Sequence, residues 1–448
     1  MEILLEIAED AVKRALALGA DEAEAYAASA KSFSIEVENN SIKSAEESHD
    51  SGIGIRSVVG KKIGFAYVTT IQESDYVEAV EKSVKLAKAS LPDPDFVSLP
   101  SFEGSYPDVG GLFDSSISNL TSEDAADLIV RTVDASLESM GKYKTSIEAQ
   151  LSASTGSKAL VNSIGISQTA RSTSAMMYSY PVIKSDDDQT SSFEYQVTRK
   201  LNTLNPEWIG NTASQNAINN LGGKVIEGGS LPVIFTPLAV GTILGSGFAR
   251  AVNAEEVQYG RSYISDAFGS RIASEQITIV DDGVLEGATG SRIFDAEGYP
   301  SQHTIVLKNG ILKSLLHNSY TAFKDSVDNT GNASRPSYAG LPSISTSNFI
   351  VEPDRGTLDE LVSEIDCGVL CRNTGDRPNM TTGDLSAMIM EGFYIERGEI
   401  KYPVKNTLIG INMKDLLMRI ERIGADVRET FSIMSPSIVV SSAKITSG

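Results

Sequence analysis

The dipeptide Asn309-Gly310 constrains the fold of this chain more tightly than any other feature. Alternating runs lie on both sides of it. Both central positions of a type I′ turn need a positive φ, which Asn and Gly adopt most readily. The sequence therefore predicts a β-hairpin in which Lys308 faces Ile311.

The register of this hairpin also fixes the expected positions of two of the three histidines. It places His303 opposite Leu316, and His317 opposite Gln302. Because side chains alternate across a strand, the two histidines are expected on opposite faces, where they cannot share a metal ion.

Length and periodicity predict two domains. The chain has 448 residues, of which 41% are hydrophobic, and this exceeds one ordinary domain. A helix is predicted to end at Gly222-Gly223, so we place the boundary near residues 222–230, between domains of residues 1–225 and 226–448. The fold class is α+β. The first domain is expected to hold an antiparallel sheet with flanking helices, and the second a β-rich, barrel-like sheet with a few helices.

In the N-terminal domain, the apolar pattern predicts a meander of four antiparallel strands. These strands are expected at residues 33–37, 42–47, 52–56 and 63–69. Thr121, followed by acidic residues, is a favourable start for a helix. His49 falls in a turn region between two strands and is expected on the surface. In the C-terminal domain, helices are predicted at residues 237–252, 358–365 and 412–424.

Composition argues against several classes of function. The formal net charge is −21, so the phosphates of a nucleic acid would repel the chain, and no nucleic-acid partner is expected. No run approaches 18 consecutive apolar residues, so no membrane span is expected. The acidic N-terminus lacks the positive charge of a signal peptide, which favours a cytoplasmic protein. Cys367 and Cys371 are expected to be reduced thiols.

Four motifs follow one another in an order typical of one protein family. They are Ser51-Gly52-x-Gly54-x-Arg56, Glu297-Gly-Tyr-Pro-Ser-Gln302, the hairpin at Asn309-Gly310, and Thr330-Gly331-Asn332. Together they resemble the TldD/PmbA family, whose members are also called modulators of DNA gyrase or TldD–TldE proteases. The resemblance covers nearly the whole chain and implies a role in proteolysis.

Active members of this family resemble metalloproteases, with His-Glu-x-x-x-His on a helix and a cysteine near the C-terminus. Two imidazoles and a thiolate then hold zinc, which makes a bound water more acidic. By alignment through the neighbouring strands, Gly245 and Arg250 stand here in place of the two histidines, and Ser246 in place of the glutamate. Neither glycine nor arginine can ligate zinc. The chain thus resembles the PmbA/TldE branch, and we expect no catalytic, cofactor or metal residue in it, with zinc in a TldD-like partner.

The same positions also have an ordinary structural interpretation. Gly245 and Gly247 can serve only to let helices pack closely, and Arg250 can be a surface or ion-paired residue. Sequence alone leaves this alternative open.

A possible peptide cleft is suggested by a second part of the resemblance. Thr382-Gly383-Asp384, followed by the strand that holds Tyr394, resembles the family's loop and strand beside the cleft. Such a strand would bind an extended peptide by pairing along its edge.

Three functions therefore remain open. The first is a subunit without zinc ligands in a TldD–TldE-type protease that processes peptides or unfolded proteins. The second is a homodimeric peptidase of the same family with an unrecognised metal site. The third is a stand-alone peptide-binding protein.

Overall fold

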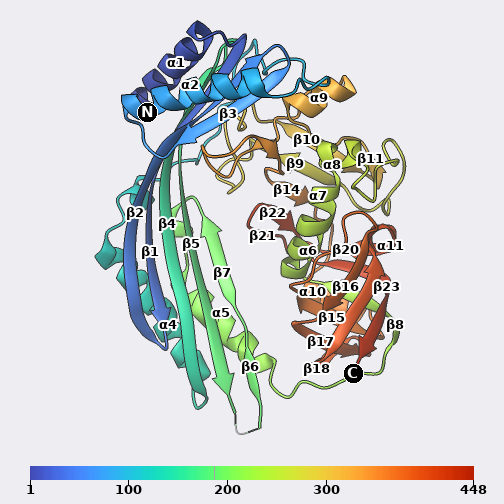
Figure 1. The fold of residues 1–448 in the computed structure, drawn as a ribbon. Helices are drawn as coiled ribbons and strands as arrows, with labels where there is room; N and C mark the ends of the chain where they lie inside the picture. The colour runs from blue at the N-terminus through green and yellow to red at the C-terminus, as the bar shows by residue number, and fades with distance from the viewer. Residues whose placement is uncertain (186) are drawn as a thin grey trace.

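The N-terminal half is built around one antiparallel sheet (Figure 1). The structure is a computed structural model that describes residues 1–185 and 187–448. The strand order is β3-β2-β1-β4-β5-β6, and β7 also pairs with β5. The strands are β1 (Glu22–Glu38), β2 (Ser41–Val59), β3 (Lys62–Val68), β4 (Lys144–Asn162), β5 (Ser167–Lys184), β6 (Gln189–Ser191) and β7 (Glu194–Thr198).

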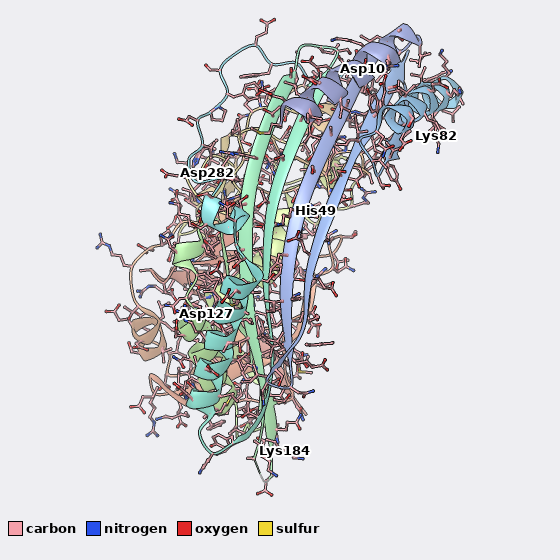
Figure 2. All side chains as sticks on the ribbon, turned by 90° about the vertical axis from the view of Figure 1, so that its left-hand side faces the viewer. Asp10, His49, Lys82, Asp127, Lys184 and Asp282 are labelled. Atoms are coloured by element: carbon pink, nitrogen blue, oxygen red, sulfur yellow. The ribbon has the colours of Figure 1, made fainter. Side chains whose placement is uncertain are left out.

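The predicted four-stranded meander is wrong, because its second and third strands are one continuous strand, β2. Residues 48–51 are polar, yet they pair with β1 in unbroken register. Backbone hydrogen bonds hold this part of the strand without an apolar side chain. His49 therefore lies within β2 opposite Lys31, and not in a turn. Its side chain is exposed, as predicted, about midway along the sheet (Figure 2).

Two pairs of long helices pack on this sheet (Figure 1). Each buries a stripe of small and aliphatic side chains, which is the periodicity that predicted it. At the start of α4, Thr121 and Asp124 form a capping box, as the sequence indicated. No helix among the described residues combines the length and apolar character that a membrane crossing requires. The helices of this half are α1 (Glu2–Ala17), α2 (Glu73–Ala89), α3 (Ser115–Ser118), α4 (Ser122–Met140), η1 (Leu201–Thr203) and α5 (Pro206–Asn219).

The C-terminal half contains two larger sheets around one hydrophobic core that includes Phe235, Phe248 and Phe349. One sheet has the order β16-β19-β23-β8-β15-β17-β18, with β20 on β23, and the other β11-β10-β9-β14-β22-β21. The predicted α+β class and β-rich second half are confirmed, although both sheets are open. The strands are β8 (Gly229–Phe235), β9 (Ile279–Asp282), β10 (His303–Lys308), β11 (Ile311–Leu312), β12 (Ala333–Ser334), β13 (Ser343–Ile344), β14 (Phe349–Val351), β15 (Cys367–Asn373), β16 (Asp384–Met388), β17 (Glu391–Glu396), β18 (Glu399–Pro403), β19 (Thr407–Asn412), β20 (Ile420–Ile423), β21 (Arg428–Thr430), β22 (Ile433–Ser435) and β23 (Ile438–Ser447).

The predicted helix over residues 412–424 is only half correct. It ends at Met418, and Ile420 then begins a strand that pairs with β23. Ile420 and Ile423 are buried by this pairing, so tertiary packing overrides the helical periodicity. The helices of this half are α6 (Pro237–Ile243), η2 (Leu244–Phe248), α7 (Ala249–Ala251), α8 (Ala254–Gln258), α9 (Ser319–Asp325), α10 (Leu358–Ser363) and α11 (Met413–Met418).

The Asn309-Gly310 turn forms as predicted, with φ of 48° and 74° and with Lys308 opposite Ile311. The hairpin ends after Leu312, however, so the predicted partners of both histidines are wrong.

The chain leaves the hairpin because a different backbone partner is available. The amide of Leu316 donates to the carbonyl of Val252, outside the hairpin. His303 instead faces Asp282 on β9. His317 is buried, and its backbone amide donates to Thr330 Oγ1 at 2.7 Å.

Candidate functional site

The helix that would hold the family's zinc motif is interrupted by a π-helical turn. It begins as α6, with Pro237 at a position where the missing N–H costs no bond. It continues as the π-helical turn η2 and ends as α7. Gly245 and Ser246 lie in the wider π-helical turn, and Arg250 lies in α7.

The residues at the three motif positions do not fit a zinc site. A Cβ on Gly245 would lie 3.0 Å from Ile433 Cγ1. Ser246 Oγ donates to the carbonyl of Thr242, one turn earlier on the same helix, and Arg250 is exposed. Zinc needs imidazole, thiolate or carboxylate ligands, and these positions offer none.

Three possible metal ligands elsewhere, His303, His317 and Cys371, are engaged in other contacts or buried. The described residues contain no group of three or more His, Cys, Asp or Glu side chains placed to hold a metal ion. His303 Nδ1 lies 3.0 Å from Asp282 Oδ2. Burial lowers the pKa of His317, which lies beside Thr321. Burial also raises the pKa of the Cys371 thiol to about 12, so this group is not a thiolate at neutral pH.

The structure places the motif helix against Pro378, four residues before the predicted loop. A Cβ on Gly247 would lie 2.7 Å from Pro378 Cγ, and the carbonyl of Met380 accepts from the amide of Tyr263. Thr381 and Tyr263 help to line a hollow of about 690 Å³ beside this loop. The Tyr263 hydroxyl is buried, and it has no hydrogen-bond partner among the described residues.

Asn412 fixes the conformation of the loop Thr382-Gly383-Asp384. Its amide nitrogen donates to the carbonyl of Thr382 and to Asp384 Oδ1, both at 2.9 Å. These hydrogen bonds leave Asp384 exposed, and the bond from Asn412 lowers the pKa of its carboxyl group. Gly383 adopts a φ of +81°, which is costly for any residue with a side chain.

Tyr394 does not join this group. It lies on β17, whereas Asp384 begins β16, and four other strands separate β16 from β17 in the sheet. The Tyr394 hydroxyl contacts Cys367 Sγ at 3.2 Å, and its ring stacks on Tyr402. β17 pairs with β15 on one side and β18 on the other, so it has no free edge for a peptide. The predicted edge pairing at this strand is therefore wrong.

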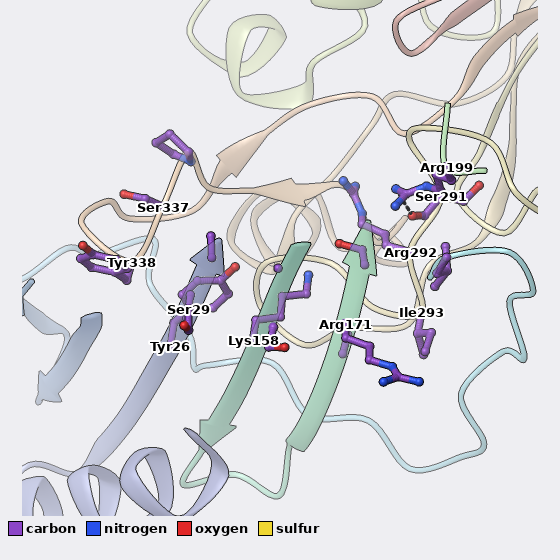
Figure 3. A pocket seen from close by; sticks show the side chains of 18 of the residues that line it. Tyr26, Ser29, Lys158, Arg171, Arg199, Ser291, Arg292, Ile293, Ser337 and Tyr338 are labelled. Carbon is purple, nitrogen blue, oxygen red and sulfur yellow. Dashed lines mark hydrogen bonds between the residues drawn. The ribbon is translucent and has the colours of Figure 1, made fainter. Parts of the chain in front are cut away.

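A second hollow, of about 440 Å³, lies between the long sheet and the C-terminal half (Figure 3). Strands β1, β4 and β5 supply one wall, which includes Tyr26 and Lys158. Residues 289–293 and 336–338 supply the opposite wall, which includes Arg292 and Tyr338. Burial lowers the pKa of Lys158 to about 8, and the positive charge of Arg292 adds to this effect.

A buried network of charges joins the two halves near this hollow. Glu24 of β1 accepts from Arg56 at 2.8 Å and also pairs with Arg335. Arg56 also donates to Glu297 at 3.2 Å. The second oxygen of Glu297 accepts from the amide and hydroxyl of Ser319. The resemblance motifs at residues 51–56 and 297–302 thus meet in one ion-pair network.

Three models of one protein family match successive parts of the chain. They are PmbA/TldA metallopeptidase domain 1 at residues 23–90, the central domain at residues 115–221, and the C-terminal domain at residues 228–447. The chain belongs to the PmbA/TldA metallopeptidase family.

Relatives of this chain include proteins named PmbA and proteins named TldD. The Metalloprotease PmbA homolog of Haemophilus influenzae is 27% identical, covering 97% of this chain and 94% of that protein. The Metalloprotease TldD homolog of Buchnera aphidicola is 27% identical, covering 88% and 83%. Among solved structures, TldE from Thermococcus kodakarensis shares the fold with a TM-score of 0.90 at 23% identity, covering 99% of this chain and 100% of that chain.

Sequence reasoning located the motif helix and the 382–384 loop of this PmbA/TldA chain, but it missed the hollow at Lys158. In the sequence, Lys158 follows Gly156 by two residues and lies on a strand with alternating polarity. That pattern does not reveal which residues lie across the sheet, because Ala28 and Ala170 flank Lys158 only after β1, β4 and β5 pair.

Proposed function

We propose that this chain is the TldE/PmbA-like, non-catalytic subunit of a TldD–TldE-type metalloprotease that acts on peptides or unfolded proteins. In this proposal a TldD-like partner holds the zinc. The proposal is carried by the sequence of one helix, which has Gly245, Ser246 and Arg250 at the positions that we align with the family's His-Glu-x-x-x-His.

The packing of this helix supports the proposal. Ile433 lies so close to Gly245 that a ligand side chain at this position would need the Ile433 side chain to shift. Thr430 Oγ1 would lie 2.1 Å from a Cβ on Gly241, one turn earlier. The helix therefore packs closely through its glycines at and before the position aligned with the first histidine.

Reconstitution tests the proposal. The purified chain, a TldD-type homologue that carries His-Glu-x-x-x-His, and an equimolar mixture are each given a quenched fluorescent peptide and an unfolded protein. Zinc is measured by atomic emission. We expect no bound zinc and no cleavage for this chain alone, and cleavage with a stable complex for the mixture.

Two outcomes would overturn the proposal. About one zinc per chain, with chelator-sensitive cleavage by the chain alone, would favour the homodimeric peptidase. Peptide binding by the chain alone, with no association and no gain in cleavage on mixing, would favour the stand-alone binding protein.

The loop at Asp384 provides a sharper test inside the complex. Asp384 is exposed beside the hollow at Tyr263, so Asp384→Ala should weaken peptide capture by the mixture several-fold while the subunits still associate. Tyr394→Ala is the matched control, because Tyr394 lies elsewhere in the sheet. Equal peptide affinity for wild type and Asp384→Ala would reject a role for this loop.

A further inference from the structure

The wall of the hollow at Lys158 is made of small residues. On β4, Lys158 lies between Ala28 of β1 and Ala170 of β5. Two residues earlier, Gly156 lies between Ala30 and Ser172. Because positions two apart share one face of a sheet, these residues leave space around a single long side chain, that of Lys158.

Lys158 is partly buried, and within the described part of the chain its ammonium group has no hydrogen-bond or ion-pair partner. It lies 4.7 Å from the centre of the Phe294 ring, and Figure 3 shows it pointing into the hollow. Asp295 is the one acid whose charge favours the protonated form. The Asp295 carboxylate, however, already accepts hydrogen bonds from three backbone amides, those of residues 297, 299 and 333.

The opposite wall adds positive charge. Arg292 lines the hollow, and its one hydrogen bond is a long contact of 3.4 Å to the carbonyl of Gly331. Arg199 is buried at the edge, where it donates to four backbone carbonyls and, among the residues that the structure describes, has no carboxylate partner. Asp50, also at the edge, accepts from the Tyr338 hydroxyl at 2.7 Å. A chain with a net charge of −21 thus keeps an excess of cations around one cavity.

We propose that this hollow binds the C-terminal carboxylate of a peptide, with Lys158 Nζ as its main partner and Arg292 as the second. Tyr26, Leu112 and Ile293 provide an apolar wall for the terminal side chain. A volume of about 440 Å³ suits one or two residues. The negative charge of Asp50 at the edge disfavours ligands with several negative charges, such as nucleotides. The choice of a peptide rests on the proposed function, whereas the carboxylate preference rests on the cavity alone.

Calorimetry with a matched pair of ligands tests this site. N-acetyl-alanyl-leucine carries a free carboxylate, and N-acetyl-alanyl-leucinamide has the same shape without the charge. We expect the acid to bind the isolated chain at least tenfold more tightly than the amide. Lys158→Met should abolish that difference. Lys158→Gln keeps a hydrogen-bond donor but removes the positive charge, so its preference for the acid shows whether charge or hydrogen bonding causes the difference.

Lys184→Met is the matched control, because Lys184 is exposed at the far end of β5 (Figure 2). The proposed site would be rejected by any of three results: equal binding of acid and amide, no binding of either, or an unchanged preference in Lys158→Met. The measurement uses no partner, so its failure is distinct from failure of the reconstituted protease. Replacing a cation that has no partner with methionine also relieves an electrostatic cost, so the variant should fold.

Discussion

At the scale of single residues, burial of the Lys158 charge in the candidate site costs stability. Burial lowers its folded-state pKa to about 8, while the unfolded chain keeps a value near 10.5. Below pH 8 both states are protonated, and only the folded state bears the cost of burying the charge. Between pH 8 and 10.5 the unfolded state binds more protons, so stability should rise with pH.

Lys158→Met should therefore stabilise the protein at pH 7 by at most about 3.5 kcal/mol, since one pKa unit corresponds to about 1.4 kcal/mol. Lys158 is only partly buried, so the expected gain is smaller than this limit. The gain should disappear above pH 10.5. Urea unfolding between pH 6 and 10.5, in a buffer free of carboxylates, measures it. A loss of stability at pH 7 would show that Lys158 has a partner that holds its charge.

Substitutions at Gly245 test whether packing around the helix excludes a zinc ligand at this position. A histidine at this position would push against Ile433, so Gly245→His should destabilise the protein by about 1–3 kcal/mol. Arg250→His, on the exposed side of the same helix, should change stability by less than about 0.5 kcal/mol. If both variants were as stable as wild type in urea, the site would have room for ligands.

At the scale of elements, sequence patterns located helices better than they located the ends of strands. The helix at Ser122–Met140 has its own start, in the capping box of Thr121. The middle of β2 has no such local feature, because residues 48–51 are held only by a partner strand. The hairpin after Asn309-Gly310 shows the same limit. Its turn is local and was predicted, whereas the departure after Leu312 depends on Val252, far away in the sequence.

Close contact between α2 and β3 depends on one residue that no periodicity reveals. A Cβ on Gly64 would lie 2.1 Å from the carbonyl of Ser83 and 2.2 Å from the amide of Ala87. Gly64→Ala should therefore cost about 3 kcal/mol, because backbone must move on both sides. Gly156→Ala is the control. Its nearest atom would be 3.9 Å away, so it should be neutral or slightly stabilising in thermal unfolding. Similar losses for both would refute the contact.

At the scale of the whole molecule, buried charge networks join the two halves. One is centred on Glu194, which pairs with Arg372 and Arg428 of the second half, and the other is centred on Glu24. Glu24 is fully buried in the first half, and it holds Arg56 of the same half together with Arg335 of the second. Burial alone would raise the pKa of Glu24, but the two guanidinium groups outweigh burial and lower it. An acid whose folded-state pKa is lowered stabilises the fold above its ordinary pKa. That contribution is lost as the pH falls through the lowered value.

Glu24→Gln leaves two buried arginines with Glu297 as their remaining carboxylate, and this should cost about 3–5 kcal/mol at pH 7. Because the Glu194 ion pairs still join the halves, the variant should keep a single transition in calorimetry, at a lower temperature than that of wild type. Its stability should also depend less on pH below 4.5 than that of wild type. Glu46→Gln, at an exposed position of β2, should be as stable as wild type. A loss under about 1 kcal/mol in Glu24→Gln would mean that the Glu194 ion pairs and apolar contacts are enough to couple the halves. In that case the Lys158 hollow, which the same two walls enclose, would keep its shape without the ion pairs of Glu24.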